Sequence, residues 1–229
     1  MYIKNRALAL FWRCACLFAC GYALVTMSNL FHGGFTNRML AYYTNLSSMI
    51  VFAYLLLSIT HTVLGIWRHG LYGASTLMPS LKRAFVMMVT ITVIVYHFAL
   101  APMAFRMNLS YHAFSLPDIL IHYVTPLGFI LDWMLFDEKK QIRRRDPLLW
   151  LILPAAYLIF VFIRAEVAEP LNAAGVRFPY FFLDLDILPA HHVLGYVILC
   201  LGVFTFVGYL YFFIDRISIS LGRDKHIDV

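Results

Sequence analysis

The sequence predicts an all-α fold: a polytopic membrane helix bundle with six transmembrane helices. Of the 229 residues, 62% are hydrophobic and 13% are charged, and the mean hydropathy is +0.77. An ordinary soluble domain has about 25% charged residues, so this chain cannot build a water-facing shell. Six stretches are apolar over the roughly 20 residues that a helix needs to cross a bilayer. The alternating pattern of membrane-barrel strands is absent.

The six predicted helices follow one another with short connections. They lie at about residues 8–31, 41–66, 83–104, 118–136, 148–168 and 190–214. No connecting segment is long enough to fold separately, so we expect residues 1–229 to form one domain. Pro126 and Pro154 fall inside the fourth and fifth helices. Because proline lacks an N–H group, we expect both residues to kink their helices and open space there.

Basic residues predict the orientation of the bundle. If both termini are cytoplasmic, most of the 18 Lys and Arg residues lie on the inner side, namely Lys4, Arg6, Arg13, Arg68, Lys82, Arg83, Lys139, Lys140, Arg143, Arg144, Arg145, Arg216, Arg223 and Lys225. The positive-inside rule therefore favours cytoplasmic termini. We expect an integral multi-pass protein of the plasma membrane. The basic run 139–145 is expected to meet anionic lipid headgroups, and no nucleic acid partner is expected.

Polar residues gather at one predicted depth, in the outer half of the bundle. Thr44 and Asn45 open the second helix, and Asp118 and His122 open the fourth. Polar groups inside apolar helices are costly unless they face an interior cavity, so they are functional hypotheses by default. The same level is expected for His97, Arg164, Glu166, Asp184, His191 and His192. We therefore predict a polar chamber that faces the outer side of the membrane.

Asp118 and His122 are the most informative pair in this chamber. They are four residues apart, so they share one face of a helix. A carboxylate there fixes the imidazole tautomer, as in a catalytic triad. A buried histidine without a catalytic role remains an alternative for His122. Thr44, followed by Ser47 and Ser48, is also typical of a small-residue stripe that lets helices approach closely.

The remaining polar residues have structural explanations. We expect Arg164 to form an ion pair with Glu166, Asp184 or Asp186, with oxyanion stabilisation as the alternative. Asp184 and Asp186, followed by His191 and His192, are metal-ligand types without a recognised spacing. Capping of the last helix is favoured over metal binding. No metal site is predicted.

Several short segments resemble a known family. They are Tyr42-Tyr43-Thr44-Asn45-Leu46-Ser47, His122-Tyr123-Val124-Thr125-Pro126, Asp132-Trp133, Arg164 and the stretch Phe178-Pro179-Tyr180-Phe181-Phe182-Leu183-Asp184. In this order they resemble the androgen-induced and androgen-dependent membrane protein family, most closely its bacterial multipass relatives. In characterised animal members, a membrane-embedded threonine and a histidine on a later helix hydrolyse fatty acid esters of hydroxy fatty acids. The resemblance implies that Thr44 and His122 are these two residues.

The chemistry of a threonine nucleophile agrees with this implication. A threonine hydroxyl is a weak nucleophile at neutral pH and needs a base within hydrogen-bond reach. His122 is the best placed candidate, and Asn45 or Arg164 would stabilise the oxyanion. The expected function is therefore hydrolysis of a membrane lipid or acyl ester. No cofactor is expected.

Two other functions remain open from the sequence. Two facing imidazoles among His97, His122, His191 and His192 would bind haem and make this an electron-transfer protein, although their spacing matches no known haem motif. A lipid or solute carrier without catalytic activity would use the same chamber, with Arg164 holding an anionic headgroup.

Overall fold

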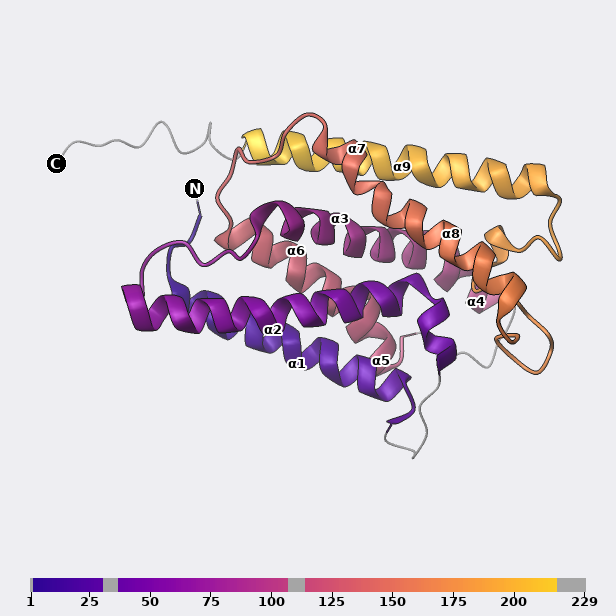
Figure 1. Cartoon of the computed structure of the whole chain (residues 1–229), viewed down its shortest axis with the longest axis horizontal. Helices are drawn as coiled ribbons and strands as arrows, with labels where there is room; N and C mark the ends of the chain where they lie inside the picture. Colours follow the sequence, from indigo (N-terminus) through magenta and orange to yellow (C-terminus); the bar gives the residue numbers. More distant parts are fainter. Residues whose placement is uncertain (1, 31–36, 107–113, 218–229) are drawn as a thin grey trace.

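The computed structural model describes residues 2–30, 37–106 and 114–217, and this part of the chain is all-α, without a β-strand. Six helices are long and apolar enough to cross a membrane. They span Arg6–Met27, Tyr43–His69, Pro79–Met103, Leu116–Phe136, Asp146–Val167 and Ala190–Ile217. The predicted fold class and the number of spans are confirmed, and Figure 1 shows the helices side by side.

Three spans are continuous helices with defined ends. They are α1 (Arg6–Met27), α2 (Tyr43–His69) and α9 (Ala190–Ile217), and the short 3-10 helices η2 (Asn37–Ala41) and η5 (Phe181–Leu183) precede α2 and α9. The Asn5 side chain accepts a hydrogen bond from the Leu8 N–H group at 3.0 Å, a common N-terminal cap. Gly70 ends α2 with a φ of 77°, which is strained for residues that have a Cβ.

The other three spans are interrupted. The third consists of α3 (Pro79–Val95), the π-helical turn η3 (Tyr96–Leu100) and α4 (Ala101–Arg106). The fourth consists of α5 (Leu116–Ile119), the π-helical turn η4 (Leu120–Val124) and α6 (Thr125–Phe136). The fifth breaks at Leu151, between α7 (Asp146–Trp150) and α8 (Ile152–Val167).

Proline explains the two π-helical turns. Pro102 and Pro126 each stand two residues after a turn, at the second position of α4 and α6. Each proline lacks an N–H group and clashes with the carbonyl four residues earlier, and the wider π turn accommodates this local change. π-helical turns are rare in proteins overall, and those that occur often lie at functional sites. The predicted irregularity at Pro126 is therefore a π turn, while Pro154 follows the break at Leu151.

The bundle has two distinguishable ends. The terminal end carries both described termini and the loops at 70–78 and 137–145, where the Ile3 N–H group donates to the Leu135 carbonyl and the Gly73 N–H group to the Lys4 carbonyl, both at 2.8 Å. The far end carries η2 and the loop at 168–189, where the Tyr157 hydroxyl donates to the Ala41 carbonyl at 2.6 Å. The basic run 139–145 therefore lies at the terminal end, beside the described N-terminal residues.

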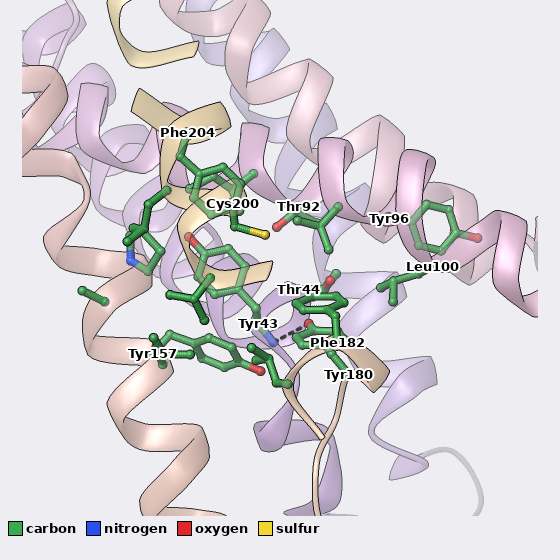
Figure 2. Close-up of a pocket in the computed structure, with 18 residues that line it drawn as sticks. Tyr43, Thr44, Thr92, Tyr96, Leu100, Tyr157, Tyr180, Phe182, Cys200 and Phe204 are labelled. Carbon is green, nitrogen blue, oxygen red and sulfur yellow. Dashed lines mark hydrogen bonds between the residues drawn. The ribbon is translucent and has the colours of Figure 1, made fainter. Parts of the chain in front are cut away.

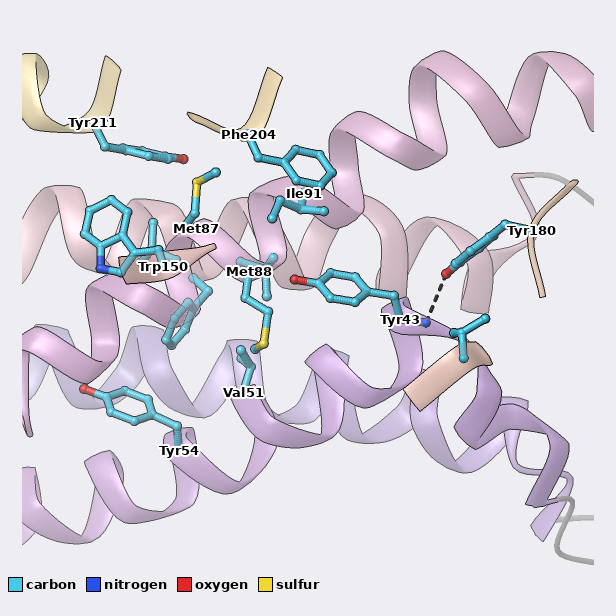
Figure 3. Packing of buried hydrophobic residues seen from close by; sticks show 14 of the residues in the cluster. Tyr43, Val51, Tyr54, Met87, Met88, Ile91, Trp150, Tyr180, Phe204 and Tyr211 are labelled. Atoms are coloured by element: carbon cyan, nitrogen blue, oxygen red, sulfur yellow. Dashed lines mark hydrogen bonds between the residues drawn. The ribbon is translucent and has the colours of Figure 1, made fainter. Parts of the chain in front are cut away.

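Aromatic and methionine side chains fill the interior between α2, α3 and α9 (Figure 3). Val51 and Tyr54 of α2 pack near Met87 and Met88 of α3, and flexible methionines suit such irregular gaps. By contrast, α9 lies at the edge of the bundle and exposes a wide apolar face. Exposed apolar helix surface of this kind is what a lipid environment covers.

Candidate functional site

A largely apolar cavity of about 110 Å³ lies in the far half of the bundle. It is enclosed by α2, α3, η3, α8, α9 and η5, which bring together residues far apart in the sequence (Figure 2). Its walls include Val95, Leu158, Phe182 and Phe204. The lining residues with polar side-chain atoms are Tyr43, Thr44, Thr92, Tyr96, Tyr157, Tyr180 and Cys200.

Thr44 reaches this cavity from the first turn of α2 (Figure 2). The residue before it, Tyr43, donates its backbone N–H group to the hydroxyl oxygen of Tyr180 at 3.0 Å. Burial raises the pKa of Tyr180 to about 12, although hydrogen bonds from Tyr43 and with the hydroxyls of Tyr157 and Thr44 oppose this increase. Tyr180 is therefore a neutral hydroxyl at neutral pH, held next to Thr44.

Hydrogen bonds between helices fix the first turns of α2. The Ser47 hydroxyl lies 2.9 Å from the Thr44 carbonyl and 3.1 Å from the Thr92 hydroxyl on α3. The Asn45 amide donates to the Met39 carbonyl of η2 at 3.0 Å. The position of Thr44 is thus set from α3 and from η2, and the Asn45 amide is engaged in holding η2.

Asp118 and His122 form the contact that their spacing predicts. His122 Nδ1 lies 3.0 Å from Asp118 Oδ1 and 3.0 Å from the Asp118 carbonyl oxygen. Both neighbours are acceptors, so Nδ1 carries a hydrogen, and in the neutral imidazole Nε2 is then the acceptor nitrogen. The same carboxylate accepts hydrogen bonds from the Tyr96 hydroxyl and from the Phe114 N–H group. The tautomer of His122 is therefore set by a buried carboxylate with several donors.

Tyr96 connects this pair to the cavity. Its ring stacks on the His122 imidazole, with centroids 3.7 Å apart and planes inclined by 17°, and it also lines the cavity (Figure 2). The two π turns therefore meet at this point, because Tyr96 belongs to η3 and His122 to η4. In the described residues, Thr44 and His122 are not hydrogen-bonded to each other, and His122 is not a lining residue.

The other residues of the predicted chamber lie elsewhere. His97 is exposed, with Nδ1 3.0 Å from the Tyr123 hydroxyl. His191 and His192 are exposed at the start of α9, with ring centroids 4.3 Å apart. Asp184 is buried, and its side chain accepts a hydrogen bond from the Asp186 N–H group at 2.9 Å. None of these residues lines the cavity in the described part of the chain.

Among the described residues, Arg177 rather than Arg164 pairs with Glu166 and Asp186. Arg164 donates to the carbonyls of Glu169 and Arg177, at 2.9 and 3.2 Å. The Arg177 guanidinium contacts Glu166 at 3.2 Å and also pairs with Asp186, and its hydrogen bond holds the pKa of Asp186 below the ordinary value. The prediction that Arg164 forms an ion pair is therefore wrong, because its guanidinium donates to nearby backbone carbonyls instead.

Sequence reasoning missed two sets of residues. The first set is Tyr96 and Tyr180, whose partners come from other helices and leave no local signal. The second is a group of buried charged residues at the terminal end, including Arg13 and Asp132, both 0% exposed. Both residues fall inside predicted helices, where charged side chains are costly, but nothing in the local sequence shows that they pair with each other.

No family model, curated protein or solved structure matches the chain. Among the residues that the structure describes, no three His, Cys, Asp or Glu side chains are grouped to hold a metal ion. The polar groups that the described residues bring to the site are hydroxyl, imidazole and carboxylate groups.

Proposed function

We propose that the protein is an intramembrane lipid-ester hydrolase in which Thr44 is the nucleophile and His122 the general base. The observation that carries the proposal is the tautomer of His122: its Nδ1 is engaged by Asp118, so Nε2 is the nitrogen that accepts a proton. Tyr96 contacts this imidazole and also lines the cavity that Thr44 reaches. The resemblance in the sequence implies the same two residues.

The reaction follows the logic of a serine hydrolase. Thr44 Oγ1 attacks the ester carbonyl carbon while its proton moves to His122 Nε2. The ester C–O bond breaks, and His122 returns the proton to the leaving alcohol. Water then attacks the acyl-threonine, its proton passes through His122 to Thr44, and the fatty acid leaves. Catalytic hydrogen bonds often shorten only when substrate binds. We therefore expect Thr44 and His122 to approach each other in the substrate complex.

Tyr180 is the oxyanion donor in this proposal. Its neutral hydroxyl lies beside Thr44 in the cavity wall, and its high pKa keeps the proton in place at neutral pH. The Asn45 amide and the Arg164 guanidinium, the two candidates for this role from the sequence, donate to backbone carbonyls instead. One well-aimed donor lowers the barrier by about 3 kcal/mol.

The apolar cavity favours an acyl substrate. Its volume of about 110 Å³ corresponds to only a few water molecules at about 30 Å³ each, so it accommodates the reacting part of a lipid rather than the whole molecule. The rest of the lipid acyl chain would extend between α8 and α9 into the bilayer, since both helices line the cavity. If the terminal end is cytoplasmic, as the positive-inside rule favours, the substrate enters from the outer leaflet of the plasma membrane.

Activity measurements on matched variants test the proposal. Thr44→Ala and His122→Ala should each lower lipid-ester hydrolysis by orders of magnitude, and the double variant should lose little more, because residues that act as a unit are non-additive. Ser48→Ala is the matched control, since this buried hydroxyl has no hydrogen-bond partner. A fluorophosphonate probe should label the wild type on Thr44 and fail on Thr44→Ala. Full hydrolysis by pure Thr44→Ala protein would exclude the covalent mechanism.

A lipid carrier is the second candidate, because Thr44 and His122 are not hydrogen-bonded in the described structure. A carrier would bind fatty acids in the same cavity without turnover. Binding of a fluorescent fatty acid by both wild type and Thr44→Ala, with no hydrolysis of any ester by the wild type, would favour the carrier.

A further inference from the structure

Four charged side chains are buried together at the terminal end, and we call them the buried ion chain. They are Arg13 of α1, Lys82 of α3, Asp132 of α6 and Asp137 just after α6, and none is more than 1% exposed. Arg13 Nε lies 3.0 Å from Asp132 Oδ1, and Lys82 Nζ lies 2.5 Å from Asp132 Oδ2 and also pairs with Asp137. Positive and negative groups therefore alternate from the interior of α1 to the end of α6.

The two ends of the buried ion chain differ in how completely their side chains are hydrogen-bonded. Arg13 donates to the Thr62 hydroxyl at 2.7 Å and to the Ser75 carbonyl at 2.9 Å. The Thr76 hydroxyl donates to Asp137 Oδ1 at 2.8 Å, but Asp137 Oδ2 has no hydrogen-bond partner. A buried charged oxygen without a partner is costly. Addition of a proton to that oxygen removes the charge and with it most of the cost.

A second cavity, of about 120 Å³, lies next to Asp137. The residues that line it are Tyr2, Ala74, Thr76, Pro79, Phe136, Asp137, Glu138 and Gln141. Glu138 and Gln141 are exposed at the terminal end, whereas Asp137 is buried. The cavity is large enough for a few water molecules, and its exposed lining residues place it next to the aqueous phase.

We propose that Asp137 is a proton-binding site, loaded from the aqueous phase at the terminal end through this cavity. The proton comes from hydronium and neutralises the carboxylate, so the buried ion chain changes from net zero charge to +1. Within the buried ion chain, Asp132 is then the one anionic partner that Lys82 keeps. The ionic contact between the start of α3 and the end of α6 weakens as a result.

The charges around Asp137 act in both directions. Burial raises the pKa of Asp137 above its ordinary value, and the charge of Asp132 raises it further. Lys82 and the Thr76 hydroxyl lower it, but Lys82 is shared with Asp132. Three further ionisable groups interact electrostatically with Asp137. They are Arg83 on α3, Lys139 in the loop after α6 and Tyr54 on α2.

A purely structural ion chain is the competing explanation, since buried pairs also hold helices in register. The two explanations differ in titration. A structural chain keeps all four charges over the pH range in which the protein is folded, whereas a proton-binding site gains a neutral carboxyl group at a pH where exposed aspartates, with a pKa of about 3.9, are still ionised.

Infrared titration of the full protein in lipid vesicles tests this. The wild type should gain the C=O stretch of a protonated carboxyl group as the pH falls, and Asp137→Asn should lack it. Glu138→Gln is the matched control, because this neighbouring carboxylate lines the same cavity but is exposed. It should keep the band.

A third variant decides the outcome even if Asp137→Asn does not fold. Thr76→Val removes the hydrogen bond to Asp137, so the proton affinity of Asp137 should rise about tenfold. An unchanged titration midpoint in Thr76→Val would overturn the proposal. So would a band that persists in folded Asp137→Asn or disappears in Glu138→Gln.

Discussion

The two halves of the bundle bury polar groups in opposite ways. In the far half, hydroxyl groups from several helices surround a cavity, and one carboxylate, Asp118, holds one imidazole, His122. In the terminal half, the charges of Arg13, Asp132 and Lys82 meet directly, each with 0% exposure.

The difference separates a half whose hydrogen bonds exchange easily from a half whose ion pairs are costly to break. A neutral hydrogen bond contributes about 1 kcal/mol, so hydroxyl groups can exchange partners when a ligand enters. Loss of one member of a buried ion pair costs several times more. In the described residues, both π-helical turns, η3 and η4, also lie in the far half. Chemistry is therefore expected in the far half, and helix registration and proton binding in the terminal half.

The largest expected effect comes from breaking the buried ion chain. Asp132→Ala leaves the Arg13 guanidinium without a carboxylate and Lys82 with only Asp137. We expect a loss of about 3–5 kcal/mol in the free energy of unfolding, measured as a lower thermal midpoint in detergent. Asp186→Ala, which removes the surface partner of Arg177, is the matched control and should leave the thermal midpoint close to that of the wild type, because solvent screens exposed ion pairs. Equal losses would remove the contrast between the two ends.

The second effect concerns catalysis in the far half. Asp118→Asn preserves the shape of the side chain but removes the negative charge that fixes the His122 tautomer. We expect hydrolysis per folded molecule to fall about 10²- to 10⁴-fold, and the thermal midpoint to fall as well, because an amide nitrogen cannot accept the hydrogen bonds that the buried carboxylate accepts. The measurement is the rate of ester hydrolysis by purified protein. Unchanged hydrolysis with folded protein would contradict the role of the pair.

The helices and the local pair could be predicted from the sequence because their signals are local. A run of apolar residues is enough to predict a span, and a separation of four residues is enough to place Asp118 beside His122 on one helical face. The first helix nevertheless ends at Met27 instead of near residue 31, because Asn29 adopts a left-handed conformation with a φ of 63°. Residue 31 lies outside the described residues.

The contacts between helices could not be predicted, because they depend on how the helices rotate against each other. The π turn at Tyr96 turns this ring onto His122 of another span. The same limit applies to Arg13, whose partner Asp132 is more than a hundred residues away. For Arg164 and Arg177 the loop geometry decides which of two arginines meets the carboxylates. Charge alone cannot distinguish these cases.

The third effect is a pH dependence at the terminal end. Lys139 is buried, and desolvation lowers its pKa from 10.5 to about 8. A lowered pKa in the folded state means that stability rises as the pH increases from about 8 to 10.5. The rise is on the order of 3 kcal/mol at most. The charged Nζ lies 4.1 Å from the centroid of the Trp133 ring, and this contact stabilises the protonated amine and so limits the rise. Thermal midpoints across this range provide the measurement.

A pair of neighbouring lysines isolates this effect. Lys139→Met should abolish the rise in stability, because no amine remains to lose its proton. Lys140→Met, a change at an exposed position, should keep the rise. The same pH profile in both variants would assign the dependence to other groups.

The smallest effect compares two adjacent serines of α2 in the far half. The hydroxyl of Ser47 is hydrogen-bonded to the Thr44 carbonyl and to Thr92, whereas that of Ser48 has no hydrogen-bond partner, and both residues are 1% exposed. Ser47→Ala should therefore lower the free energy of unfolding by about 1 kcal/mol. Ser48→Ala should leave it unchanged or raise it, because a buried hydroxyl without a partner is removed. The two thermal midpoints, measured in the same detergent, give the difference directly. A larger loss in Ser48→Ala than in Ser47→Ala would mean that the hydroxyl contacts between α2 and α3 do not hold Thr44 in place.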